Sequence, residues 1–138
     1  MQDNIVELLH KGEYSCVVSN GEETRTFSKR GVIDLYELIE NDLPFLNGSS
    51  IADKVVGKAA ATLMILSGVS RVYAEVISEP AIDLIKNTKI ELTFGKAVPL
   101  IENRDKSGIC PLEKTCMNTN SLQELFIRIE EFINRMRH

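Results

Sequence analysis

The segment Asp53-Lys-Val-Val-Gly-Lys-Ala-Ala-Ala-Thr-Leu-Met-Ile-Leu66 is nearly all apolar and lies at the centre of the chain. Apolar residues on every side of a helix indicate burial, and its small residues allow close packing of backbones. We therefore predict a buried helix over residues 53–66, with Ser50 and Asp53 spaced as a capping box at its start. A strand over residues 71–77 and a helix over residues 79–87 follow directly, so two helix N-termini are expected at one end of the same strand.

The flanking residues continue this alternation of helices and strands. Asn20-Gly21 between two strand-like runs predicts a hairpin. The predicted elements are strands over 14–18, 24–27 and 89–94, an extra strand over 97–101, helices over 3–11, 32–39 and 122–137, a turn-rich segment over 41–50, and a short helix opened by Cys110-Pro111. The order predicts an α/β fold, a three-layer α/β/α sandwich on a mixed sheet, in one domain over residues 1–138. Strands 71–77 and 89–94, joined by the intervening helix, should be parallel with a right-handed crossover.

The composition excludes several classes of protein. The chain has 138 residues, of which 43% are hydrophobic, and a formal net charge of -4. This negative balance disfavours nucleic acid and acidic membranes as partners, and the lack of tryptophan disfavours a base-stacking surface. No apolar run reaches membrane-spanning length, and residues 1–10 lack the pattern of a signal peptide. The chain has an odd number of cysteines, namely Cys16, Cys110 and Cys116. We therefore expect reduced thiols in a cytoplasmic protein.

Residues 53–60, Ser78-Glu79 and residues 103–113, taken with this order of elements, resemble a small prokaryotic family known as domain of unknown function 1893. The resemblance implies a cytidine-deaminase-like fold and supplies no activity. Deaminases of that fold hold zinc with a His or Cys on one helix and a Cys pair on the next, and a Glu moves protons. Here Lys58 lies where the first motif would be, and Ala81 and Leu84 stand in place of the Cys pair. Zinc-dependent deamination, a metal site and a cofactor are therefore not expected.

Lys58 is a candidate ligand-binding residue because helix N-termini at the end of a strand attract anions. A lysine in a dry pocket could instead act as a base or nucleophile. A third interpretation places Lys54, Lys58 and Thr62 on a solvated edge of the buried helix. Asp53 is a candidate as well, although capping and the helix dipole favour an Asp at a helix N-terminus and make a cap the preferred interpretation.

The second helix and the loop over residues 102–113 supply the remaining candidates. Ser78 and Glu79 suit capping of the helix, and Glu79 also suits contact with a ligand. A thiol such as Cys110 before a helix-starting proline is either reactive or a small buried hydrophobe. In the loop, Arg104 suits an anion clamp or a surface ion pair. Asp105 and Glu113 complete the list of candidates.

We therefore predict a pocket at the N-termini of helices 53–66 and 79–87, closed by the loop 102–113. In the first hypothesis the protein is a small-molecule binding or regulatory domain, with a nucleotide-like or other anionic ligand. A second hypothesis is a metal-independent enzyme in which Cys110 or Lys58 reacts, assisted by Glu79 or Glu113.

A third hypothesis is a protein-interaction domain or homo-oligomer. Its contacts would involve the amphipathic helix 122–137 or an edge of the sheet.

Overall fold

The computed structural model describes residues 2–29, 32–103 and 105–137. Its strands are β1 (Cys16–Asn20), β2 (Glu23–Phe27), β3 (Ser50–Val56), β4 (Arg71–Ser78) and β5 (Glu91–Val98). Its helices are α1 (Gln2–Lys11), α2 (Ile33–Leu46), α3 (Lys58–Leu66), α4 (Glu79–Ile85), α5 (Pro111–Thr115) and α6 (Leu122–Met136). The predicted α/β fold is confirmed.

The strands form one mixed sheet in the order β2-β1-β3-β4-β5. β1 pairs antiparallel with β2 and with β3, whereas β3 with β4 and β4 with β5 are parallel. The hairpin turns at Gly21, whose φ of 63° is a conformation that glycine adopts without strain. The predicted hairpin and the predicted parallel unit of β4, α4 and β5 are both confirmed.

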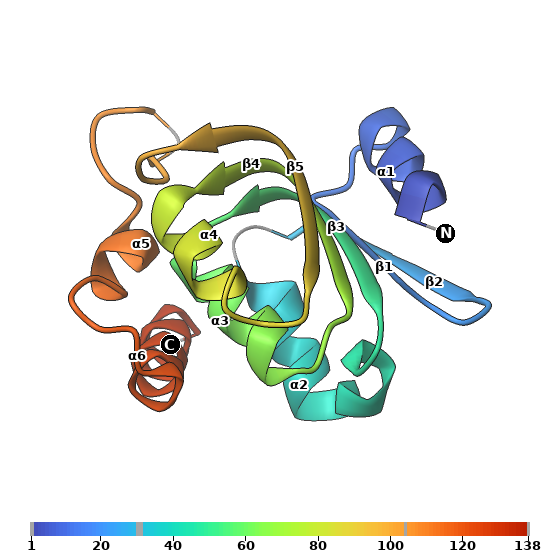
Figure 1. Cartoon of the computed structure of the whole chain (residues 1–138). Coiled ribbons are helices and arrows are strands. Elements are labelled where there is room, and N and C mark those ends of the chain that lie inside the picture. Colours follow the sequence, from blue (N-terminus) through green and yellow to red (C-terminus); the bar gives the residue numbers. More distant parts are fainter. Residues whose placement is uncertain (1, 30–31, 104, 138) are drawn as a thin grey trace.

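Helices cover both faces of the sheet (Figure 1). α1 packs on one face, where Ile5 and Leu9 meet Val17 of β1 and Ala52 of β3. The main core lies on the other face, where the sheet meets α2, α3 and α6. α3 is buried along most of its length in this layer, as its composition predicts. The layers are therefore those of a three-layer α/β/α arrangement.

The prediction of one helix over residues 53–66 was wrong. Residues 50–56 form β3, and α3 begins only at Lys58, after Gly57 in an extended conformation with φ −94° and ψ −174°. Antiparallel pairing with β1 and parallel pairing with β4 hold residues 50–53 in the middle of the sheet. Asp53 is therefore a strand residue and caps no helix.

Two other boundaries differ from the prediction. α2 continues to Leu46 through the segment expected to be a turn, with a break at Asp42, where φ is −155° and ψ is 54°. Pro44 lies just after that break, in the first turn of the helical segment that follows. Proline is tolerated there because an N–H in the first turn has no partner within the helix. The strand β5, at one edge of the sheet, runs without a break from Glu91 to Val98. The expected strands 89–94 and 97–101 are therefore not separate. No described helix is long and apolar enough to cross a membrane.

Candidate functional site

The first turn of α3 lies at the edge of the sheet where β3 and β4 end. Val56 of β3 and Ile77 of β4 are paired in the sheet, and each is followed two residues later by the start of a helix. The N-termini of α3 and α4 therefore lie at the same edge of the sheet. No side chain of Gly57 can cap α3, and the first N–H groups of a helix lack partners within it. The N–H of Lys58 instead donates to Oε1 of Glu113 at 2.7 Å.

Glu113 of α5 thus places its carboxylate at the start of α3. Its other oxygen, Oε2, accepts a hydrogen bond from the N–H of Ile101 at 2.9 Å, and the residue is only 3% exposed. Gly57 permits this approach, since a Cβ there would lie 3.0 Å from Oε1 of Glu113 and 3.2 Å from Cγ1 of Ile101. Two main-chain donors from separate segments therefore hold both oxygens of one buried carboxylate.

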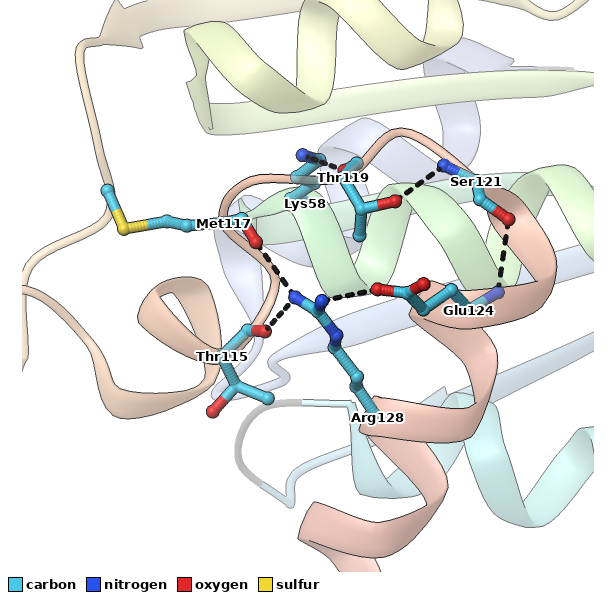
Figure 2. A network of polar contacts seen from close by, with 7 residues as sticks. All are labelled: Lys58, Thr115, Met117, Thr119, Ser121, Glu124 and Arg128. Carbon is cyan, nitrogen blue, oxygen red and sulfur yellow. Dashed lines mark hydrogen bonds and ion pairs between the residues drawn. The ribbon is translucent and has the colours of Figure 1, made fainter.

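The ammonium of Lys58 is buried as well and donates to the carbonyl oxygen of Thr119 (Figure 2). Thr62 is fully buried one turn on, and its hydroxyl donates to the carbonyl oxygen of Lys58 at 2.8 Å. Lys54 belongs to β3. The interpretation of these residues as a solvated helix edge was therefore wrong.

Arg128 of α6 holds the segment that Lys58 contacts. Figure 2 shows its guanidinium between the carbonyl oxygens of Thr115 and Met117, to which it donates at 3.2 and 2.8 Å, and it also pairs with Glu124. Thr115 is the last residue of α5, and positive charge is favourable there because the last carbonyl oxygens of a helix lack partners within it. Sequence reasoning missed Arg128, which lies among the exposed charges of an amphipathic helix.

Ser78 and Glu79 occupy the predicted first turn of α4. Ser78 is buried and its Oγ accepts a hydrogen bond from the N–H of Ala81 at 3.4 Å, which confirms its role as the N-cap. Glu79 is exposed in the same turn. Ser78 is therefore engaged within the chain, whereas the Glu79 carboxylate faces solvent.

The loop over residues 102–110 folds back on itself. Glu102 and Ile109 form an antiparallel bridge, and Oδ1 of Asp105 accepts from the N–H and the hydroxyl of Ser107 at 3.0 and 2.6 Å. These bonds lower the pKa of Asp105. The candidate Arg104 lies outside the described residues. The Asp105 carboxylate therefore accepts hydrogen bonds within its own turn.

Cys110 ends this loop as the residue before α5, the position predicted for it. It is partly buried, and its N–H donates to the carbonyl oxygen of Ile101 at 2.9 Å. Cys16 and Cys116 are buried, and burial raises the pKa of Cys116 to about 11 and that of Cys16 well above its usual value. Of the three free thiols, Cys110 is the one with access to solvent.

Asp53 lies apart from these residues, in a second polar cluster beneath α2. It pairs with Cys16 across the ladder, and Asp34, from the first turn of α2, is buried as well. Burial, with the charge of Asp34, raises the pKa of Asp53 to about 7. Sequence reasoning missed Asp34, although an acid among the apolar residues Val32 and Leu35 was a usable signal.

An apolar hollow of about 210 Å³ lies near the far end of α3 from Lys58. It is lined by Ile39, Leu43, Leu66, Ser67 and Phe126. Leu43 and Leu66 are 43% and 45% exposed there. The hollow lies on the layer that α6 shares with α2 and α3, where the interaction hypothesis placed a contact.

Comparison with known proteins identifies the family. Residues 4–133 match the family model described as TM1506: Domain of unknown function (DUF1893). The chain belongs to this DUF1893 family. A crystal structure of a DUF1893 family protein (TM1506) from Thermotoga maritima superposes with a TM-score of 0.83 at 25% sequence identity, covering 94% of this chain and 88% of that one. No curated relative matches the chain.

Proposed function

We propose that this DUF1893 protein is a zinc-independent cytoplasmic domain of cytidine-deaminase-like architecture that binds a small anionic ligand. The ligand would contact the N–H groups of Lys58 and Ile101, in the place that the Glu113 carboxylate fills. A carboxylate or a nucleotide-like phosphate satisfies such donors equally well. Neither nucleic acid nor a membrane enters this proposal.

The observation that carries the proposal is the pair of hydrogen bonds to Glu113. A buried carboxylate is stable only where its oxygens are hydrogen-bonded, and here both are, at 2.7 and 2.9 Å. The positive end of the α3 dipole adds to the attraction for negative charge. The donors are therefore preorganised for an anion, and an external anion binds by replacing the side chain of Glu113.

The donor chemistry supports independence from zinc. Lys58 offers an ammonium, which is a donor, and Ala81 and Leu84 offer hydrocarbon at the positions where the resemblance to deaminases would place metal ligands. Among the described residues, no group of three or more His, Cys, Asp or Glu side chains could hold a metal ion.

The proposal can be tested with the variant Glu113→Ala. Removing the carboxylate leaves the buried N–H of Lys58 and the partly buried N–H of Ile101 without their acceptor, so we expect destabilisation of about 2–4 kcal/mol. Acetate, formate or inorganic phosphate should then raise the melting temperature above that in chloride at equal ionic strength. The matched control is Glu131→Ala, a change of an exposed glutamate on α6, which should show no such rescue.

Native mass spectrometry of the freshly purified wild-type protein completes the test. A bound anionic small molecule that is lost in Lys58→Pro, which removes the main-chain N–H at the first position of α3, would identify the ligand and support the proposal. A bare wild-type protein, together with a Glu113→Ala variant that responds to acetate, formate and phosphate no more than to chloride, would overturn it.

A further inference from the structure

The strand β2 forms one edge of the sheet. Of the strands in the described part of the chain, only β1 pairs with it, from Asn20 opposite Glu23 to Cys16 opposite Phe27. Figure 1 shows the hairpin of β1 and β2 projecting from the body of the fold. An edge strand presents main-chain donors and acceptors along its outer side, and these groups can pair with a strand from another chain.

The hairpin turn determines which residues of β2 direct their main-chain groups outward. The turn consists of residues 21–22 and closes at the pair Asn20 and Glu23. In a hairpin with a two-residue turn the closing pair is hydrogen-bonded, and hydrogen-bonded pairs then alternate along the ladder. The N–H and C=O groups of Thr24 and Thr26 therefore point away from β1, toward the outer side of the sheet.

The side chains of β2 carry opposite charges on one face. Glu23 and Arg25 project from the same face because side chains alternate along a strand. Cζ of Arg25 lies 3.8 Å from the centroid of the Phe45 ring, and its Nη2 binds Asp42 at 2.9 Å, so this face is the one toward α2. Nε of Arg25 binds Oε2 of Glu23 at 2.6 Å. Nη1 of Arg25 and Oε1 of Glu23 take part in neither bond, so a second carboxylate and a second guanidinium can bind there.

A second copy of β2 complements these charges when the two strands pair antiparallel. A two-fold axis through Thr24 places Glu23 of each copy opposite Arg25 of the other. Thr24 then forms the central hydrogen-bonded pair with its own equivalent, and the flanking pairs are of the kind in which side chains lie closest. A two-fold axis through Arg25 would instead place two guanidiniums opposite each other, which is unfavourable. Charge therefore selects the axis at Thr24.

The other edge strand, β5, lacks this complementarity. It is longer, from Glu91 to Val98, but its charged residues Glu91 and Lys96 are an odd number of positions apart and project from opposite faces. Antiparallel pairing about a two-fold axis places only side chains of the same face opposite each other. These two charges therefore cannot pair between two copies of β5, and β2 is the edge suited to self-association.

We propose that β2 is the contact of a homodimer, in which the β2 strands of two copies pair antiparallel about Thr24 and join the two sheets into one. Glu23 of each copy forms an ion pair with Arg25 of the other. The ladder is short, so the dimer is weak, and its ion pairs make it weaker as salt rises. This inference does not depend on the proposed anion site.

Charge reversal tests the dimer by sedimentation velocity at low salt, at chain concentrations from about 5 µM to about 500 µM. The wild type should become dimeric as concentration rises. Glu23→Arg and Arg25→Glu each place like charges opposite each other twice, so each variant should associate at least about tenfold more weakly. An equimolar mixture of the two variants places Arg opposite Glu at both pairs and should recover the dimer.

The matched control is Glu131→Arg, which makes the same change of charge at an exposed position of α6 and should dimerise as the wild type does. A wild type that is monomeric at every concentration, or a Glu23→Arg variant that associates as well as the wild type, would overturn the β2 dimer. A monomeric mixture of the two variants, each shown by circular dichroism to be folded, would overturn the register.

Amide exchange measured by NMR in the wild type avoids reliance on any variant. The N–H of Thr24 points outward in the monomer and is hydrogen-bonded in the dimer, so its protection should increase with chain concentration. Protection of Thr24 that does not depend on concentration would contradict the proposal.

Discussion

The Glu113 carboxylate caps the first turn of α3 through a hydrogen bond of 2.7 Å to the N–H of Lys58, a residue 55 positions earlier in the chain. A local capping residue is absent because Gly57 has no side chain. The Glu113 carboxylate thus takes the place of an N-cap side chain, because negative charge is favourable at a helix N-terminus. The same hydrogen bond couples α5 to the centre of the fold.

Gly57→Ala should destabilise the protein by about 1–3 kcal/mol, because the new methyl group would lie 3.0 Å from Oε1 of Glu113. Urea denaturation of the single and double variants measures the coupling. In a Glu113→Ala background, the same change should be less harmful. Gly108→Ala is the control, since nothing lies within 4 Å of a Cβ at that glycine. Equal losses for Gly57→Ala in the two backgrounds would show that the residues are not coupled.

Arg128→Met should loosen the segment between α5 and α6 while the helical stem is kept. The change removes the donors at 3.2 and 2.8 Å to the carbonyl oxygens of Thr115 and Met117, and a loss of about 1–3 kcal/mol is expected. Hydrogen exchange should rise first in residues 115–121. Arg135→Met on the exposed end of α6 should leave this segment protected, and equal exchange in both variants would contradict the role of Arg128.

Thiol labelling should distinguish the cysteines in the folded protein. Cys110 is partly exposed, whereas Cys16 and Cys116 are buried and burial raises their pKa values. We expect iodoacetamide at neutral pH to modify Cys110 first, as read from peptide masses, and all three in urea. Slow, equal labelling of the three native thiols would also remove Cys110 as the nucleophile in the enzyme hypothesis.

The stability of the wild type should depend on pH through Asp53. Its pKa is raised from 3.8 to about 7 in the folded state, so the folded state binds this proton more tightly than the unfolded state. The stabilisation is complete below the unfolded value and is lost as pH rises to about 7, by up to about 4 kcal/mol. Urea denaturation from about pH 4 to about pH 8 should show this fall in the wild type and a flatter profile in Asp53→Asn. A profile of equal slope in the variant would exclude Asp53 as the source.

Local sequence signals predicted the hairpin, the unit of β4, α4 and β5, and the cap of α4. Asn20-Gly21 suits a tight turn, and the hydroxyl of Ser78 accepts from the N–H of Ala81 as an N-cap does. These features depend on residues within a few positions of one another, which is why they could be read directly from the chain.

Residues 50–56 show what the sequence by itself left undetermined. A short apolar run suits a buried strand or a buried helix equally, and only the pairing with β1 and β4 decides for the strand. The same holds for the polar groups, since Glu113 meets Lys58 only after distant segments pack. The sequence determined the hairpin and the unit of β4, α4 and β5. The tertiary structure determined that residues 50–56 form a strand and which buried polar groups meet, because burial and pairing arise from contacts between residues far apart in the chain.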